Sequence, residues 1–70
     1  MQRYLILIET TPSGYSAYSP DVPGCVATAA SRPEVEKVMQ EAIEFHLEGM
    51  REDKLPIPQP STVCEYVEVA

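Results

Sequence analysis

The stretch LPIPQPS, residues 55–61, constrains the fold of this chain of 70 residues more than any other feature. Proline stands at every second position, at 56, 58 and 60. A proline donates no backbone hydrogen bond and holds the residue before it extended. This stretch therefore cannot be helix. We predict a polyproline-like connector between the elements before it and a last segment, 62–70.

The residues before the connector, SRPEVEKVMQEAIEFHLEGMRE (31–52), predict an amphipathic helix. Ser31 suits the N-cap, and Glu34 three residues later completes a capping box. Pro33 falls in the first turn, where a missing N–H is tolerated. The predicted apolar stripe, with residues three and four apart, comprises Val35, Val38, Met39, Ala42, Phe45, His46, Gly49 and Met50. On the polar side, Glu44, Glu48 and Glu52 form a row of like charges.

Four segments predict β-strands: RYLILIE (3–9), YSAYS (15–19), CVATAA (25–30) and TVCEYVEVA (62–70). TTPSG (10–14) predicts a turn between the first two. In the first strand, Tyr4, Ile6 and Ile8 point to one face, and Leu5 and Leu7 point to the other. A strand that is apolar on both faces is typical of the interior of a sheet.

These elements predict a single α+β domain over residues 1–70 with the order β-β-β-α-β. Three antiparallel strands alternate in direction, and the helix returns the chain so that the last strand runs parallel to the first. A right-handed crossover places it beside the first strand, which gives a mixed four-stranded sheet in the order 3-2-1-4. One helix covers one face only. The uncovered apolar face, with Leu5 and Leu7, predicts a homodimer or tetramer.

Composition narrows the classes of partner. The formal net charge is −6, and the five Lys and Arg residues form no cluster, so we expect no nucleic-acid binding. An acidic surface instead suits a basic protein. The apolar run near the N-terminus is too short for a membrane span or a signal peptide, so we expect a cytoplasmic protein with reduced cysteines.

No constellation of residues predicts catalysis, a cofactor or a metal. Cys25, Cys64 and His46 lack paired ligand spacing, and nothing in the sequence places a thiol beside the imidazole. The order of elements is also that of the first part of a ribonuclease-H-like fold. A nuclease of that type needs an acid in the middle of its first strand, but Glu9 lies at the end of it. Glu65 or Glu68 could supply a second carboxylate, without an evident cluster.

The stretch SPDVPGC (19–25) is either a reactive loop or a rigid corner, and we favour the corner. Pro23 and Gly24 suit the two central positions of a type II turn, because glycine adopts the positive φ at little cost. Asp21 can accept a hydrogen bond from the backbone N–H of Gly24 or Cys25.

Two of these stretches carry a resemblance to a known family. Pro20-Asp21-Val22-Pro23-Gly24-Cys25 follows a strand with Tyr15 and Tyr18, and an acid-rich helix leads into Pro56-Ile57-Pro58-Gln59-Pro60. This arrangement resembles the HicB-like antitoxins, in particular short stand-alone domains, over nearly the whole chain. The resemblance implies a partial ribonuclease-H-like fold. Full-length HicB antitoxins usually carry a C-terminal DNA-binding module. The chain up to Ala70 has no room for one, so we expect no direct DNA binding.

The resemblance also implies a function. We expect a non-catalytic antitoxin domain that binds and neutralises a small basic mRNA-cleaving toxin of the HicA type. Candidate surfaces for the toxin or for a second copy are the exposed sheet face, with Leu5 and Leu7, and the helix acids Glu44, Glu48 and Glu52. An orphan homo-oligomeric interaction module and a degenerate ribonuclease-H-like nuclease remain alternatives.

Overall fold

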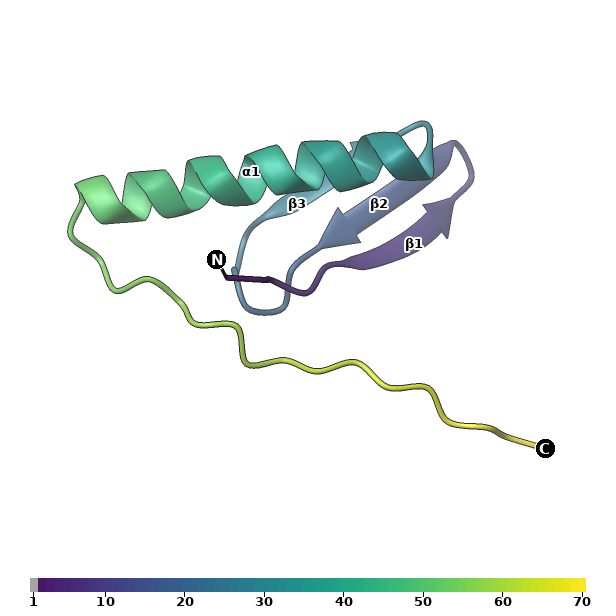
Figure 1. Cartoon of the computed structure of the whole chain (residues 1–70). Helices are drawn as coiled ribbons and strands as arrows, with labels where there is room; N and C mark the ends of the chain where they lie inside the picture. Colours follow the sequence, from purple (N-terminus) through teal and green to yellow (C-terminus); the bar gives the residue numbers. More distant parts are fainter. Residues whose placement is uncertain (1) are drawn as a thin grey trace.

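The computed structural model describes residues 2–70, in which three strands precede one helix. The strands are β1 (Leu7–Thr11), β2 (Gly14–Tyr18) and β3 (Val26–Ala29), and the helix is α1 (Arg32–Glu52). The sheet is antiparallel throughout, with β2 between β1 and β3. Figure 1 shows α1 lying across one face of this sheet.

The hairpins and the helix agree with the sequence pattern. Pro12 and Ser13 form the tight connection between β1 and β2, which is shorter than the turn predicted over 10–14. The pairing runs from Leu7 opposite Tyr18 to Thr11 opposite Gly14, so Thr11 and Gly14 belong to the strands. β1 begins at Leu7, whereas we predicted a strand from residue 3. Residues 2–6 lead into the sheet without being part of it.

The predicted four-stranded sheet in the order 3-2-1-4 is wrong. Within residues 2–70 the sheet has three strands, and β1 is an edge strand rather than an interior one. Residues 62–70 have no regular secondary structure and are exposed throughout. The segment runs away from the body of the molecule (Figure 1). The alternating prolines keep residues 55–61 extended after α1, but strand-forming side chains in residues 62–70 do not by themselves determine an edge with which to pair.

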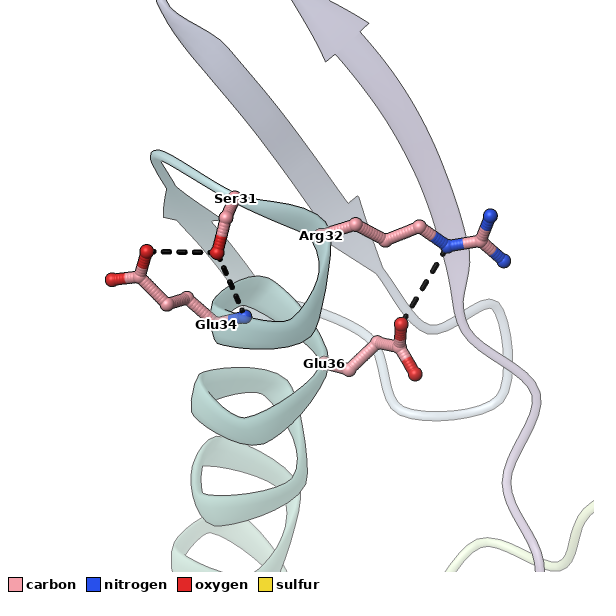
Figure 2. Close-up of polar contacts among 4 residues, drawn as sticks. All are labelled: Ser31, Arg32, Glu34 and Glu36. Carbon is pink, nitrogen blue, oxygen red and sulfur yellow. Dashed lines mark hydrogen bonds and ion pairs between the residues drawn. The ribbon is translucent and has the colours of Figure 1, made fainter.

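Side-chain hydrogen bonds cap the start of α1 (Figure 2). Ser31 is the N-cap, as predicted, and its hydroxyl oxygen accepts a hydrogen bond from the backbone N–H of Glu34 at 3.3 Å. The same hydroxyl donates to the Glu34 carboxylate at 2.8 Å. This differs from a capping box, in which that carboxylate accepts from the N-cap backbone N–H. One turn further, Arg32 and Glu36 form an exposed ion pair at 3.5 Å.

The end of α1 has a Schellman motif in which a lysine takes the place usually held by glycine. The N–H of Leu55 donates to the carbonyl of Met50, and the N–H of Lys54 donates to that of Arg51. Lys54 has φ +57, in the left-handed region. The motif reverses the chain direction immediately before the proline connector.

The core lies between α1 and the covered face of the sheet. α1 contributes a buried residue every four positions: Val35, Met39, Ile43 and Leu47. The rest of the buried core comes from β2, β3 and the β2–β3 loop: Ala17, Val22, Cys25 and Ala27.

The predicted apolar stripe of the helix is therefore partly wrong. It included Val38 and Phe45, which are 41% and 80% exposed, and it omitted Ile43 and Leu47. Val38 and Phe45 lie on the flank of the helix beside the buried row, so they also fit a three- and four-residue spacing. Tyr4, Ile6 and Ile8 pack against the core, as their common parity predicts.

Candidate functional site

The corner between β2 and β3 is built from two successive turns. The N–H of Val22 donates to the carbonyl of Ser19, and the N–H of Cys25 donates to the carbonyl of Val22, both at 3.2 Å. Gly24 has φ +83, the value that the third position of a type II turn requires. The predicted Pro23–Gly24 turn is thus present.

Asp21 has a different role from the one expected. Its carboxylate does not cap its own turn but binds residues forty positions further along the chain. It accepts hydrogen bonds from the backbone N–H groups of Ser61 (3.2 Å) and Thr62 (3.1 Å). It also accepts from the hydroxyls of Ser61 (3.2 Å) and Thr62 (2.7 Å). The Thr62 hydroxyl is the largest cause of the lowered pKa of Asp21, because it stabilises the charged carboxylate.

Other polar contacts connect the corner region to the N-terminal residues. The buried Ser19 hydroxyl donates to the carbonyl of Leu5 at 2.9 Å. The Tyr4 hydroxyl donates to the carbonyl of Pro58 at 2.6 Å, which joins the N-terminal residues to the proline connector. The corner therefore fixes both the approach to β1 and the start of the segment after the connector. No short-range sequence pattern predicts the Asp21 contact, because its donors are distant in sequence.

The thiols and the imidazole belong to three different parts of the chain. Cys25 is buried at the end of the corner, and its burial raises the pKa of the thiol. Cys64 is exposed in the segment after the connector, and His46 is half-buried on α1. Across residues 2–70, no group of three or more His, Cys, Asp or Glu side chains could hold a metal ion. That finding includes Glu9, Glu65 and Glu68, the carboxylates considered for a nuclease.

A groove between α1 and the N-terminal residues combines apolar walls with an acidic rim. Its apolar side chains come from both sides: Tyr4 and Ile6, and Ile43 and Leu47 from α1. The polar residues around it are Gln2, Glu36, Gln40, Glu44 and Arg51. Such a groove suits a protein segment that presents an apolar residue together with basic ones.

The sheet face turned away from α1 carries a short apolar row. Leu7 pairs with Tyr18, and Tyr18 pairs with Val26, so the three side chains lie side by side across the strands. Tyr18 and Val26 are 43% and 69% exposed. The next row on this face, Glu9, Ser16 and Thr28, is polar. The uncovered face is thus apolar at one end only.

The predicted partner residues fall on two sides of the molecule. Leu5 and Leu7 are half-buried and belong to the parity that faces away from α1. Glu44, Glu48 and Glu52 are exposed on α1, on the opposite side of the sheet. Only Glu44 borders the groove. The structure does not unite the two candidate surfaces into one patch.

Among residues 2–70, no helix combines the length and apolar character that a membrane crossing requires.

Comparison with known proteins identifies the family to which the chain belongs. A family model described as "HicB_like antitoxin of bacterial toxin-antitoxin system" matches residues 4–69. The chain is 39% identical over 64 residues to an uncharacterized 14.9 kDa protein in the rep-hol intergenic region of Haemophilus phage HP1 (strain HP1c1). That alignment covers 91% of this chain and 48% of the phage protein, so the chain spans about half the length of that relative. Because the family match includes the helix, the corner and the proline connector, the resemblance noted in the sequence is confirmed. The chain belongs to the HicB-like antitoxin family.

Proposed function

We propose that this chain binds a small basic mRNA-cleaving toxin of the HicA type and neutralises it by covering its active surface. The observation that carries the proposal is the family match over residues 4–69. In this role the chain acts by binding and catalyses no reaction. The formal net charge of −6 supports a basic partner, because opposite charge accelerates encounter and disfavours acidic competitors.

The groove beside α1 is the surface best suited to the toxin. Its apolar walls, with Tyr4, Ile43 and Leu47, offer contacts that exclude water, while Glu44 offers a carboxylate to basic side chains. Glu48 and Glu52 continue the acidic surface along α1. The uncovered sheet face is less suited to a basic partner because it offers few carboxylates. Beside its apolar row, the next row contributes a single acid, Glu9.

Two pairs of substitutions with equal charge test this assignment. Glu44→Lys with Glu48→Lys changes the acidic surface of α1, and Glu65→Lys with Glu68→Lys changes an exposed segment elsewhere. Both pairs change the formal net charge from −6 to −2. Binding to a small basic mRNA-cleaving toxin of the HicA type is measured by calorimetry.

The expected result distinguishes an effect of where the substituted carboxylates lie from an effect of the net charge of the chain. The α1 pair should weaken binding by about tenfold or more, whereas the pair at 65 and 68 should change it by no more than about threefold. Equal weakening by both pairs would contradict the groove as the binding surface. Absence of binding by the unmodified chain would contradict the proposed function itself.

A further inference from the structure

One wall of the groove beside α1 comes from residues 2–6, which precede the paired part of the sheet. Gln2, Tyr4 and Ile6 line the groove, so every second residue of this N-terminal wall turns toward it. Strand pairing begins only at Leu7. The ladder of backbone hydrogen bonds that holds a strand in place does not extend to this wall, and its position therefore depends on other contacts.

Side-chain hydrogen bonds join the N-terminal wall to the proline connector. The Tyr4 hydroxyl donates to the carbonyl of Pro58 at 2.6 Å, and it also lies 2.9 Å from the side-chain oxygen of Gln2. The Gln2 amide in turn donates to the side-chain oxygen of Gln59 at 2.8 Å. The glutamine pair is exposed, so water competes with it, whereas the Tyr4–Pro58 contact is partly buried. The Tyr4 hydroxyl is therefore the main link between wall and connector.

The connector is itself fixed on both sides of Pro58. On one side, Ile57 packs against the buried core. On the other side, the backbone N–H groups of Ser61 and Thr62 donate to the Asp21 carboxylate. Asp21 does not line the groove beside α1, so it can act on that groove only through the connector.

We propose that the proline connector is a strap that positions the N-terminal wall of the toxin groove, and that the Tyr4 hydroxyl is the group through which it acts. The Tyr4 ring lines the groove, and its hydroxyl holds the ring and the wall in one arrangement. A wall that is already in place raises affinity, because apparent affinity falls with the fraction of molecules that are competent to bind. The proposal rests on the proposed function, since it concerns the same groove and the same toxin.

Tyr4→Phe tests the strap, because it removes the hydroxyl and keeps the ring that lines the groove. Tyr66→Phe is the matched control, since Tyr66 is 94% exposed in the segment after the connector. In the free chain, the heteronuclear NOE of the backbone amides of residues 2–6 should fall in Tyr4→Phe only, while that of α1 stays high in both variants. Toxin binding, measured by calorimetry, should weaken by about three- to tenfold in Tyr4→Phe and by less than about twofold in the control.

Asp21→Asn distinguishes positioning from direct contact between the Tyr4 hydroxyl and the toxin. Because position 21 lies outside the groove, the connector has to carry any specific effect on toxin binding. Glu68→Gln is the control, since it removes one charge as well and lies in an exposed segment. Asp21→Asn should weaken binding by about threefold more than Glu68→Gln does. The double variant with Tyr4→Phe should lose less affinity than the product of the two single losses, because both substitutions loosen the same connector.

The two kinds of measurement separate failure of the strap from failure of the proposed function. An unchanged NOE at residues 2–6 in Tyr4→Phe would overturn the strap. Toxin binding weakened no more by Tyr4→Phe or Asp21→Asn than by the matched control, or losses that multiply in the double variant, would overturn the positioning role. If the unmodified chain binds no toxin, the proposed function fails, and the NOE of the free Tyr4→Phe chain still decides whether the connector holds the wall.

Discussion

Asp21 joins two parts of the chain that lie forty residues apart, and it does so through its charge. Its carboxylate accepts all four hydrogen bonds from Ser61 and Thr62. These contacts lower its pKa from the usual 3.8. The contact is therefore present at neutral pH, where the carboxylate is charged, and is lost as the pH falls through the lowered pKa.

An acid titration followed by NMR checks this contact. The amide signals of Ser61 and Thr62 should move together with a midpoint below 3.8, the usual pKa of the group. Asp21→Asn should remove the titration and speed hydrogen exchange at both amides, while the amides of α1 keep their protection. A midpoint above 3.8, or unchanged exchange in the variant, would show that the carboxylate does not hold the segment.

Gly24 and Lys54 both have positive φ, but only Gly24 lacks the side chain that this conformation disfavours. Gly24 (φ +83) suits its turn, whereas Lys54 (φ +57) has a side chain in a region that favours glycine. No heavy atom lies within 4 Å of a Cβ built at Gly24, so the cost of Gly24→Val comes from the backbone alone. We expect Gly24→Val to lower the free energy of unfolding by about 1–2 kcal/mol and Lys54→Gly to raise it by up to about 1 kcal/mol.

Urea unfolding measures both changes. Gly24→Asn is the control for the turn, because asparagine tolerates positive φ better than valine does. Equal losses for Gly24→Asn and Gly24→Val would show that something other than backbone strain determines the cost. A loss of stability in Lys54→Gly would contradict the helix end described above.

At the scale of elements, the buried row of α1 decides how the helix packs. Met39 is fully buried, whereas Phe45 is 80% exposed although it is the larger apolar residue. Met39→Ala should lower the free energy of unfolding by about 2–5 kcal/mol, a large part of the total for a domain of this size. Phe45→Ala should change it by less than about 0.5 kcal/mol. Thermal unfolding of both variants checks the assignment, and a larger loss for Phe45→Ala would mean that the helix packs through its flank instead.

The elements also show which parts of the fold the sequence predicts. The β1–β2 hairpin, the Pro23–Gly24 turn and the Ser31 cap depend on neighbours in sequence, and all three were predicted correctly. The fourth strand was wrong because pairing of residues 62–70 depends on a distant edge, and strand-forming residues alone do not determine a partner. The Asp21 contact was missed for the same reason. The helix stripe was displaced because Phe45 and Ile43 both fit the spacing, and burial of the helix against the sheet decides between them.

At the scale of the whole molecule, the acidic surface of α1 and the apolar row of the sheet lie on opposite sides. A single small partner can therefore contact one of these two surfaces but not both. The segment 62–70 extends from the body, and the longest dimension of the molecule is 47 Å against 28 Å and 20 Å for the others. The proposed toxin surface, the groove beside α1, therefore leaves the apolar row of the sheet free.

Inhibition of RNA cleavage tests the central claim most directly. A small basic mRNA-cleaving toxin of the HicA type is incubated with an RNA substrate, and cleavage is measured as this chain is added. We expect cleavage to stop when the two proteins are present in equal amounts, and Glu44→Lys with Glu48→Lys to require a larger excess of the chain. Cleavage that continues undiminished in the presence of excess unmodified chain would contradict the assignment of this protein as the antitoxin of that toxin.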